Sequence, residues 1–188
     1  MTKYLILDTE SGSRHSTSTL LTTYFMVTDE NFNMLDELYL SLKPDNDEHY
    51  IVDAQGLGVN KIDLVQHDKI ALPYKQVKPT LYQFLMKNAG GNKLVPVGHA
   101  VKNDIRRITD TLISIGSWEQ FCSYHYIDTS VVLQFLRACG KMPLDCDGSV
   151  EALVTYFNII IEGGYHNAKT DTQATASILK KFIELGKN

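Results

Sequence analysis

The chain has 188 residues, of which 44% are hydrophobic and 21% are charged, so it is long enough to fold as one domain around its own core. Its formal net charge of −4 argues against tight, non-specific wrapping of duplex nucleic acid, but it is compatible with a small acidic cleft that works through cations. No run of about 18 apolar residues occurs, so no membrane span is expected. The N-terminus has no signal-peptide pattern and the three cysteines have no Cys-x-x-Cys spacing, so we expect reduced thiols and a cytoplasmic location.

The first part of the chain predicts a meander of three strands. The β-rich runs are 3–8, 20–28 and 34–42. A polar turn at Asp29–Asn33 joins the second strand to the third as a hairpin, and Pro44–Asp47 ends the meander. The polar stretch that follows, up to about Tyr74, is expected to hold a short helical turn.

Beyond Tyr74 the pattern alternates between helices and strands. Helices are predicted at 74–86, 103–115, 131–139, 149–157 and 167–185, and short strands at 93–98 and 124–127. The Asp128-Thr129-Ser130 sequence is expected to cap the helix that follows it. We therefore predict a single α/β domain over residues 1–188, with a mixed sheet flanked by helices.

Two carboxylates end the first predicted strand. The alternation of side chains along a strand places Asp8 and Glu10 on the same face of the sheet. Neighbouring anions repel each other, so this arrangement is unfavourable unless a cation lies between them. Taken alone, the pair is explained more simply as a solvated strand end, and its meaning depends on the rest of the chain.

Three further ionisable residues follow other predicted strand and helix ends. Asp104 lies early in the helix that follows the Val95–Gly98 strand, near the carboxyl edge of that strand, although the helix dipole alone would favour an acid there. His166 and Asp171 lie about one turn apart at the start of the last helix, on about the same face if the helix has begun by His166. The helix dipole alone would also favour an acid near the start of that helix.

Convergence of these residues would create a metal site. Four carboxylates at one sheet edge call for divalent cations, and oxygen-only ligands favour Mg²⁺ or Mn²⁺ over zinc. Two such ions about 3.5–4 Å apart can activate a water and stabilise the leaving oxygen of a phosphodiester. A neutral histidine nearby can take the proton from that water near pH 7.

Three segments resemble the exonuclease motifs of the DEDDh family. They are Leu7–Gly12 (LDTESG), Gly98–Ile105 (GHAVKNDI) and His166–Thr175 (HNAKTDTQAT), which match the family in order and spacing over nearly the whole chain. This family of 3′–5′ exonucleases has an RNase H-like fold. It includes proofreading subunits of bacterial replicative polymerases, oligoribonuclease and RNase T.

The resemblance implies a role for each motif residue. Asp8, Glu10 and Asp171 would hold the tighter of two Mg²⁺ or Mn²⁺ ions, Asp8 would bridge to the second ion, and Asp104 would position it. His166 would be the general base, and the product would be a nucleoside 5′-monophosphate released from a 3′ end. The implied substrate-binding residues are Thr9, Ser11, Gly12, His99 and Asn103, although His99 is also a candidate for a purely structural hydrogen bond.

The sequence departs from the family pattern just after the first motif. Where relatives often place an apolar wedge beside the terminal base, this chain has Arg14 and His15. Arg14 is a candidate phosphate contact or a solvated loop residue. Arg106 and Arg107, in the helix that carries Asp104, are candidates for holding the substrate backbone or for a solvated helix face.

These observations together predict a metal-dependent 3′–5′ exonuclease that acts on single-stranded DNA or RNA ends. Two roles are compatible with that activity: a free-standing trimming enzyme, and a proofreading exonuclease that acts in trans with a DNA polymerase. The rival from another class is a catalytically silent scaffold that binds nucleic acid or protein. That rival predicts the loss of a ligand or of the base, whereas all five positions are filled. The sequence leaves homodimerisation and the choice between DNA and RNA open.

Overall fold

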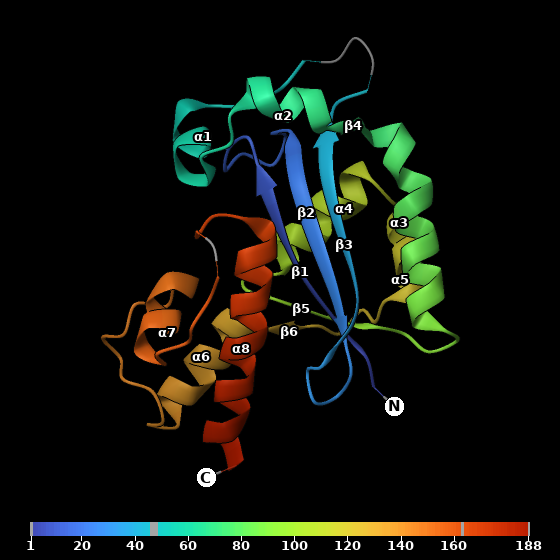
Figure 1. The fold of residues 1–188 in the computed structure, drawn as a ribbon. Coiled ribbons are helices and arrows are strands. Elements are labelled where there is room, and N and C mark those ends of the chain that lie inside the picture. Colours follow the sequence, from blue (N-terminus) through green and yellow to red (C-terminus); the bar gives the residue numbers. More distant parts are fainter. Residues whose placement is uncertain (1, 46–48, 163, 188) are drawn as a thin grey trace.

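In the computed structural model, which describes residues 2–45, 49–162 and 164–187, strands and helices alternate after an initial strand meander (Figure 1). The strands are β1 (Tyr4–Ser11), β2 (Leu20–Thr28), β3 (Met34–Lys43), β4 (Leu72–Pro73), β5 (Val95–Gly98) and β6 (Ile127–Asp128). The helices are α1 (Ala54–Asn60), α2 (Leu64–Ile70), α3 (Tyr74–Ala89), α4 (Lys102–Thr111), α5 (Ile115–Phe121), α6 (Thr129–Ala138), α7 (Val150–Tyr156) and α8 (Ala168–Lys187).

Within the described residues, the six strands form one mixed sheet in the order β4-β3-β2-β1-β5-β6. The β1–β2 and β2–β3 pairs are antiparallel, whereas β5 pairs in parallel with β1 and with β6. The sheet is therefore a three-strand meander extended by parallel strands, as the sequence predicted. β1 lies at the junction between the antiparallel and the parallel part.

Helices cover both faces of the sheet, and the side chains of β1 alternate between them (Figure 1). Leu5 and Leu7 belong to the large apolar core that includes side chains of α3, α4 and α5. Ile6 instead belongs to a core on the other face, which includes Ala176 and Leu179 of α8. This period of two explains why every residue of the central strand β2 is buried.

The structure differs from the sequence prediction in several connecting segments. The stretch before Tyr74 forms two helices, α1 and α2, where we expected one short turn. Asp53 and Asp63 start these helices by accepting hydrogen bonds from backbone N–H groups of the first turn. The helix predicted to reach Ile115 ends at Thr111, and Ser114 caps a separate helix, α5.

Other differences are small or fall outside the described residues. The strand predicted at 124–127 is shorter and shifted, because β6 pairs with β5 only through Ile127 and Asp128. The predicted end of the meander at Pro44–Asp47 lies partly outside the described residues. All three cysteines are free thiols. None of the helices in the described part of the chain combines the length and the apolar character needed to cross a membrane.

Candidate active site

The site forms where β1 extends past its neighbour β5. β5 pairs with β1 only as far as Ile6, so the last part of β1, from Asp8 to Ser11, has no partner on that side. Side chains from both faces of the sheet can therefore approach this stretch of β1. The pairing with β2 continues to the end of the strand, with a shift in register between Glu10 and Ser11.

Asp8, Glu10 and Asp171 converge at this point. One carboxylate oxygen from each residue lies within 4.8 Å of the other two, and all three side chains are partly buried. Asp8 and Glu10 share a face because they are two residues apart in β1. Asp171 reaches them from the first turn of α8, which Asn167 caps by accepting a hydrogen bond from the Lys169 N–H at 3.0 Å.

Asp104 approaches β1 from the opposite face of the sheet. It lies in the first turn of α4, is only 8% exposed, and accepts a 2.6 Å hydrogen bond from the Thr9 hydroxyl. Thr9 alternates with Asp8 and Glu10 and so points to the side of the sheet that α4 covers. The negative charge of Asp104 nevertheless reaches Asp8, whose pKa it raises after the larger effect of burial. The fourth predicted carboxylate therefore acts on Asp8 through its charge, although it is not one of the three whose oxygens converge within 4.8 Å.

The carboxylates are held in conditions that disfavour their charge. Burial, followed by repulsion from the neighbouring acids, raises the pKa of Asp8 well above its ordinary value and that of Glu10 to about 7. Burial also raises the pKa of Asp104 to about 7 and that of Asp171 above its ordinary range. A cation bound between these groups would relieve both the repulsion and the desolvation.

The donor set fits divalent metal ions with a preference for oxygen. Within the described residues, the group consists of carboxylates alone, with no cysteine or histidine among the three that converge. Hard cations such as Mg²⁺ and Mn²⁺ prefer such ligands, whereas zinc sites usually include nitrogen or sulfur. The side chains present therefore match the ions that the sequence predicted.

His166 lies beside Asp171, but the two do not share a helix face. α8 begins at Ala168, and His166 precedes it as an exposed residue with a left-handed φ of 62°. The condition for a shared helix face, that the helix has begun by His166, is therefore not met, whereas the predicted start near Asn167 agrees with α8. The tight turn nevertheless brings the two residues together, because the His166 charge and the backbone N–H groups of His166 and Asn167 lower the pKa of Asp171.

Glu151 adds a further carboxylate near this site that the sequence analysis did not assign. It lies in the first turn of α7, is exposed, and contributes to the raised pKa of Asp171. No sequence feature singles out Glu151, because an acid in the first turn of a helix is common.

The predicted substrate-binding residues fall into two groups. Thr9, Ser11 and Asn103 line a cavity of about 410 Å³ beside the carboxylates. Gly12 is buried under that cavity, and an added Cβ would lie only 2.4 Å from Val52 Cγ1, so glycine is needed there for close packing.

His99 does not line this cavity. Its Nδ1 lies 2.9 Å from the Thr129 hydroxyl, and burial lowers its pKa. These contacts give His99 a structural role, and its contact with substrate stays a prediction. Asp128 caps α6 as predicted and also accepts a hydrogen bond from the Ala100 N–H at 2.9 Å.

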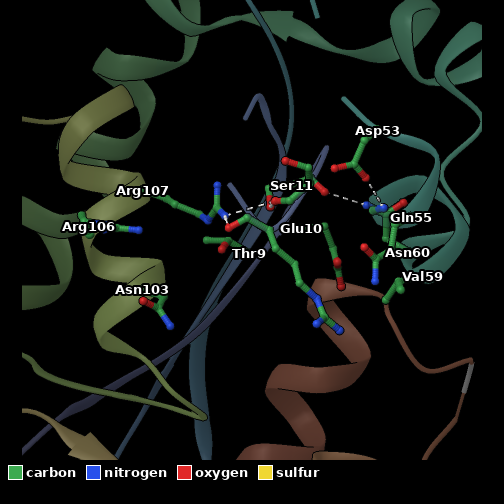
Figure 2. Close-up of a pocket in the computed structure, with 13 residues that line it drawn as sticks. Thr9, Glu10, Ser11, Asp53, Gln55, Val59, Asn60, Asn103, Arg106 and Arg107 are labelled. Atoms are coloured by element: carbon green, nitrogen blue, oxygen red, sulfur yellow. Dashed lines mark hydrogen bonds between the residues drawn. The ribbon is translucent and has the colours of Figure 1, made fainter. Parts of the chain in front are cut away.

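Helix α1 forms a wall of the cavity that sequence reasoning missed. Figure 2 shows α1 and α4 facing each other across the end of β1, with Gln55, Val59 and Asn60 on the α1 side. Asn60 donates a 3.0 Å hydrogen bond to the Ser11 carbonyl and so ties α1 to β1. The capping residue Asp53 was the local signal for this helix, but nothing in the sequence linked the helix to the motifs.

Arg107 holds the loop between β1 and β2. Its guanidinium is partly buried and donates to the Ser18 hydroxyl at 3.0 Å and to the Ser13 carbonyl at 3.2 Å. It also lies near the carbonyls of Arg14 and His15. Of the two α4 arginines considered in the sequence analysis, Arg107 thus uses its guanidinium in hydrogen bonds within the protein.

Comparison with solved structures identifies a shared fold. The model superposes on exonuclease I from Methylocaldum szegediense with a TM-score of 0.75 at 15% identity, over 98% of this chain and 40% of that chain. For E. coli exonuclease I in complex with a dT13 oligonucleotide the TM-score is 0.75 at 16% identity, over 96% of this chain and 41% of that one. For cell-death related nuclease 4 it is 0.72 at 15% identity, over 99% and 65% of the two chains.

These likenesses confirm the fold that the motif resemblance implied. The chain has the mixed α/β architecture of the exonuclease I structures and spans about two fifths of their length, 40% to 43% of each. No protein-family model matches the chain. No curated protein matches it by sequence either. The chain thus has the fold of these exonuclease structures, with an acidic centre at the end of β1.

Proposed function

We propose that this protein is a metal-dependent 3′–5′ exonuclease that removes nucleoside 5′-monophosphates from single-stranded DNA or RNA. The observation that carries the proposal is the convergence of Asp8, Glu10 and Asp171 within 4.8 Å. Three acids from opposite ends of the chain meet where burial disfavours their charge, which stability alone does not explain. Asp104 adds a fourth carboxylate from the other side of β1.

The carboxylates would hold two Mg²⁺ or Mn²⁺ ions. Asp8, Glu10 and Asp171 supply the oxygens that converge, and Asp104, whose charge acts on Asp8, would serve the second ion. When bound, such ions neutralise charge on the scissile phosphate and on its leaving oxygen. The Thr9 hydroxyl orients the Asp104 carboxylate through its 2.6 Å hydrogen bond.

His166 is suited to accept the proton of the attacking water. It is exposed at the mouth of the site, next to Asp171, and so can reach a water that approaches the phosphate from solvent. The water oxygen forms a bond to phosphorus, the bond from phosphorus to the 3′ oxygen of the upstream nucleotide breaks, and that oxygen leaves with a proton. The terminal nucleotide then departs as a 5′-monophosphate.

Single strands are the substrate that best suits this surface. The chain has a net charge of −4, which disfavours extended contact with a duplex. The cavity of about 410 Å³ beside the carboxylates is of the size that holds a small ligand, so it can take part of a strand end. A structure with the same fold, E. coli exonuclease I, was solved with a dT13 oligonucleotide.

The first test is a time course on 5′-labelled single-stranded DNA and RNA of the same sequence, with Mg²⁺, Mn²⁺ or EDTA. We expect a ladder that shortens from the 3′ end, requires metal and is absent in Asp171→Ala. The ratio of the two rates gives the sugar preference. A metal-dependent internal cut would indicate an endonuclease instead, and no cleavage of either strand would support the silent-scaffold alternative.

A further inference from the structure

Two arginines that line the cavity have no side-chain partner among the described residues. Arg14, from the loop after β1, and Arg106, from α4, both line the cavity and are exposed. Among the described residues, neither guanidinium takes part in an ion pair or in a side-chain hydrogen bond. Their neighbour Arg107, by contrast, uses its guanidinium to hold the loop.

The loop that carries Arg14 has a defined position. The Arg107 guanidinium contacts the carbonyls of residues 13–15, and the Ser18 hydroxyl also donates to the Ser13 carbonyl, at 2.9 Å. The loop is further fixed at Gly12, whose N–H donates to the Thr19 carbonyl at 2.9 Å and whose carbonyl accepts from the Asp53 N–H at 2.9 Å. The backbone of Arg14 is therefore anchored on both sides, and only its side chain is free to meet a ligand.

The lining of the cavity suits an anion better than a stacked base. None of the described lining residues is aromatic, so the cavity has no stacking platform for a base. The donors on its walls that make no hydrogen bond among the described residues include the guanidinium groups of Arg14 and Arg106 and the amides of Gln55 and Asn103. Two acids also line the cavity: Asp53 is engaged as the cap of α1, accepting from the Gly56 N–H at 2.6 Å, and Glu10 is one of the three converging carboxylates, where a bound cation would offset its charge.

We propose that Arg14 and Arg106 together bind a second phosphate of the substrate, distinct from the phosphate that is cleaved. The proposal rests on the exonuclease function, since the cleaved phosphate must lie at the four carboxylates. Arginine forks bind phosphate oxygens through paired hydrogen bonds, and such contacts are stronger than neutral ones. This pair of arginines, called the phosphate clamp below, would contact the sugar-phosphate backbone of the substrate. Its contribution to binding would therefore not depend on base sequence.

The chemistry of the reaction limits where this second phosphate can be. In a strand with a 3′ hydroxyl, the scissile phosphate is the last one, so a second phosphate belongs to the next linkage on the 5′ side. In a strand with a 3′ phosphate, it can instead be the terminal group. A dinucleotide with free hydroxyl ends has only one phosphate and so would gain nothing from the clamp.

The test compares three short substrates that differ in phosphate number. They are a dinucleotide, a trinucleotide, and the dinucleotide with a 3′ phosphate, in the DNA or RNA form that the wild type cleaves faster. Each is measured with the wild type, with the Arg14→Gln/Arg106→Gln double variant, and with Lys78→Gln. Lys78 is an exposed cation on α3 that does not line the cavity, so it is a matched control for loss of charge.

We expect the wild type to favour the trinucleotide over the dinucleotide by about tenfold in kcat/KM, the factor that corresponds to about 1.4 kcal/mol. The double variant should lose this advantage, and Lys78→Gln should keep it. An advantage confined to the 3′-phosphorylated dinucleotide would support the clamp and place the second phosphate at the strand end. If the ratio of kcat/KM for the trinucleotide to that for the dinucleotide were the same in the wild type and the double variant, the clamp would be overturned. The exonuclease function would be unaffected by that result.

A binding measurement separates the clamp from catalysis. Equilibrium titration of a labelled single strand is done with Ca²⁺ in place of Mg²⁺, at several salt concentrations. Each phosphate neutralised on a single strand adds about 0.7 to the slope of log Kd against log salt, so the double variant should show a slope lower by about that amount. If no substrate is cleaved, the exonuclease function fails, and this slope alone decides on the clamp: an unchanged slope overturns it.

Discussion

The side chain of Asp171 shows the conflict between stability and function at this site. Burial raises its pKa, and Glu151 adds to that effect, although His166 and nearby backbone N–H groups oppose it. One carboxylate oxygen of Asp8 and one of Glu10 lie within 4.8 Å of a carboxylate oxygen of Asp171. Without a cation, these acids repel one another, so the protein retains a destabilising group where the chemistry needs it.

Replacing Asp171 with asparagine should therefore have opposite effects on stability and on activity. Asp171→Asn keeps the shape and the hydrogen-bond acceptor but removes the charge, so the melting temperature in EDTA should rise by a few degrees. Exonuclease activity in Mg²⁺ should fall by at least about a hundredfold, the scale of a lost electrostatic contact in catalysis. Thermal unfolding with and without Mn²⁺ checks both parts, since the variant should lose most of the metal-induced rise.

His166 should affect the rate of cleavage more than the affinity for substrate. His166→Ala removes a proton acceptor but no metal ligand, so we expect kcat to drop by about 10²–10⁴. The Kd for a single strand measured in Ca²⁺ should stay within about twofold. His125→Ala, at an exposed histidine that lines none of the described site, provides the control. Weak binding by His166→Ala would make His166 a positioning residue instead.

At the level of the elements, the loop between β1 and β2 depends on a side chain from α4. Arg107 crosses from that helix to the Ser13 carbonyl and the Ser18 hydroxyl, so it joins the element that carries Asp104 to the loop that carries Arg14. Burial lowers the pKa of the Arg107 guanidinium, and the nearby negative charge of Asp104 partly opposes this effect. Losing Arg107 would remove hydrogen bonds from a charged donor, although the Ser13 carbonyl would keep its bonds from the Ser11 and Ser18 hydroxyls.

Arg107→Met should loosen this loop without unfolding the sheet. The lost hydrogen bonds from the charged guanidinium predict a loss of about 2 kcal/mol in the free energy of unfolding. Hydrogen exchange should speed up at the amides of residues 13–19 and stay unchanged in β2, which is held by its strand partners on both sides. Arg107→Lys should recover only part of the protection, because lysine cannot bridge several acceptors with a planar fork. Unchanged exchange in the loop would show that its own turns suffice.

The sequence anticipated the elements that a local pattern specifies. The β2 strand was predicted with the bounds that it has, because nine consecutive β-forming residues lie between clear turns. The four carboxylates were found because each follows the end of a strand or the start of a helix, positions that meet at one edge of a mixed sheet. Local pattern and motif spacing thus agreed at these residues.

What the sequence missed depends on contacts between distant segments. The α1 wall of the cavity is tied to β1 through Asn60 and the Ser11 carbonyl, 49 residues apart. The role of Arg107 is likewise set by acceptors about 90 residues away, and its neighbour Arg106 shows no such contact. Two adjacent arginines look alike in sequence, and only the direction of each side chain on the helix separates them.

For the molecule as a whole, the buried acids should make stability depend on pH in the direction opposite to that of most proteins. Burial raises the pKa of Glu10 from 4.5 to about 7, so the folded state holds its proton more tightly than the unfolded chain does. The raised pKa of Asp104, about 7, acts in the same sense. Between these values the folded state binds more protons, so the free energy of unfolding falls as pH rises from about 4.5 through 7.

The metal-free protein should therefore melt at a lower temperature at pH 8 than at pH 5.5. Divalent ions reverse the trend because they bind the ionised carboxylates, so Mn²⁺ should raise the melting temperature more at pH 8 than at pH 5.5. Thermal unfolding in EDTA and in Mn²⁺ across this range measures both slopes, and Asp171→Asn should flatten the slope in EDTA by removing one of the interacting charges. A melting temperature that rises with pH in EDTA would mean that groups elsewhere in the molecule, such as the exposed carboxylates Asp29 and Asp68 with their lowered pKa values, outweigh the site.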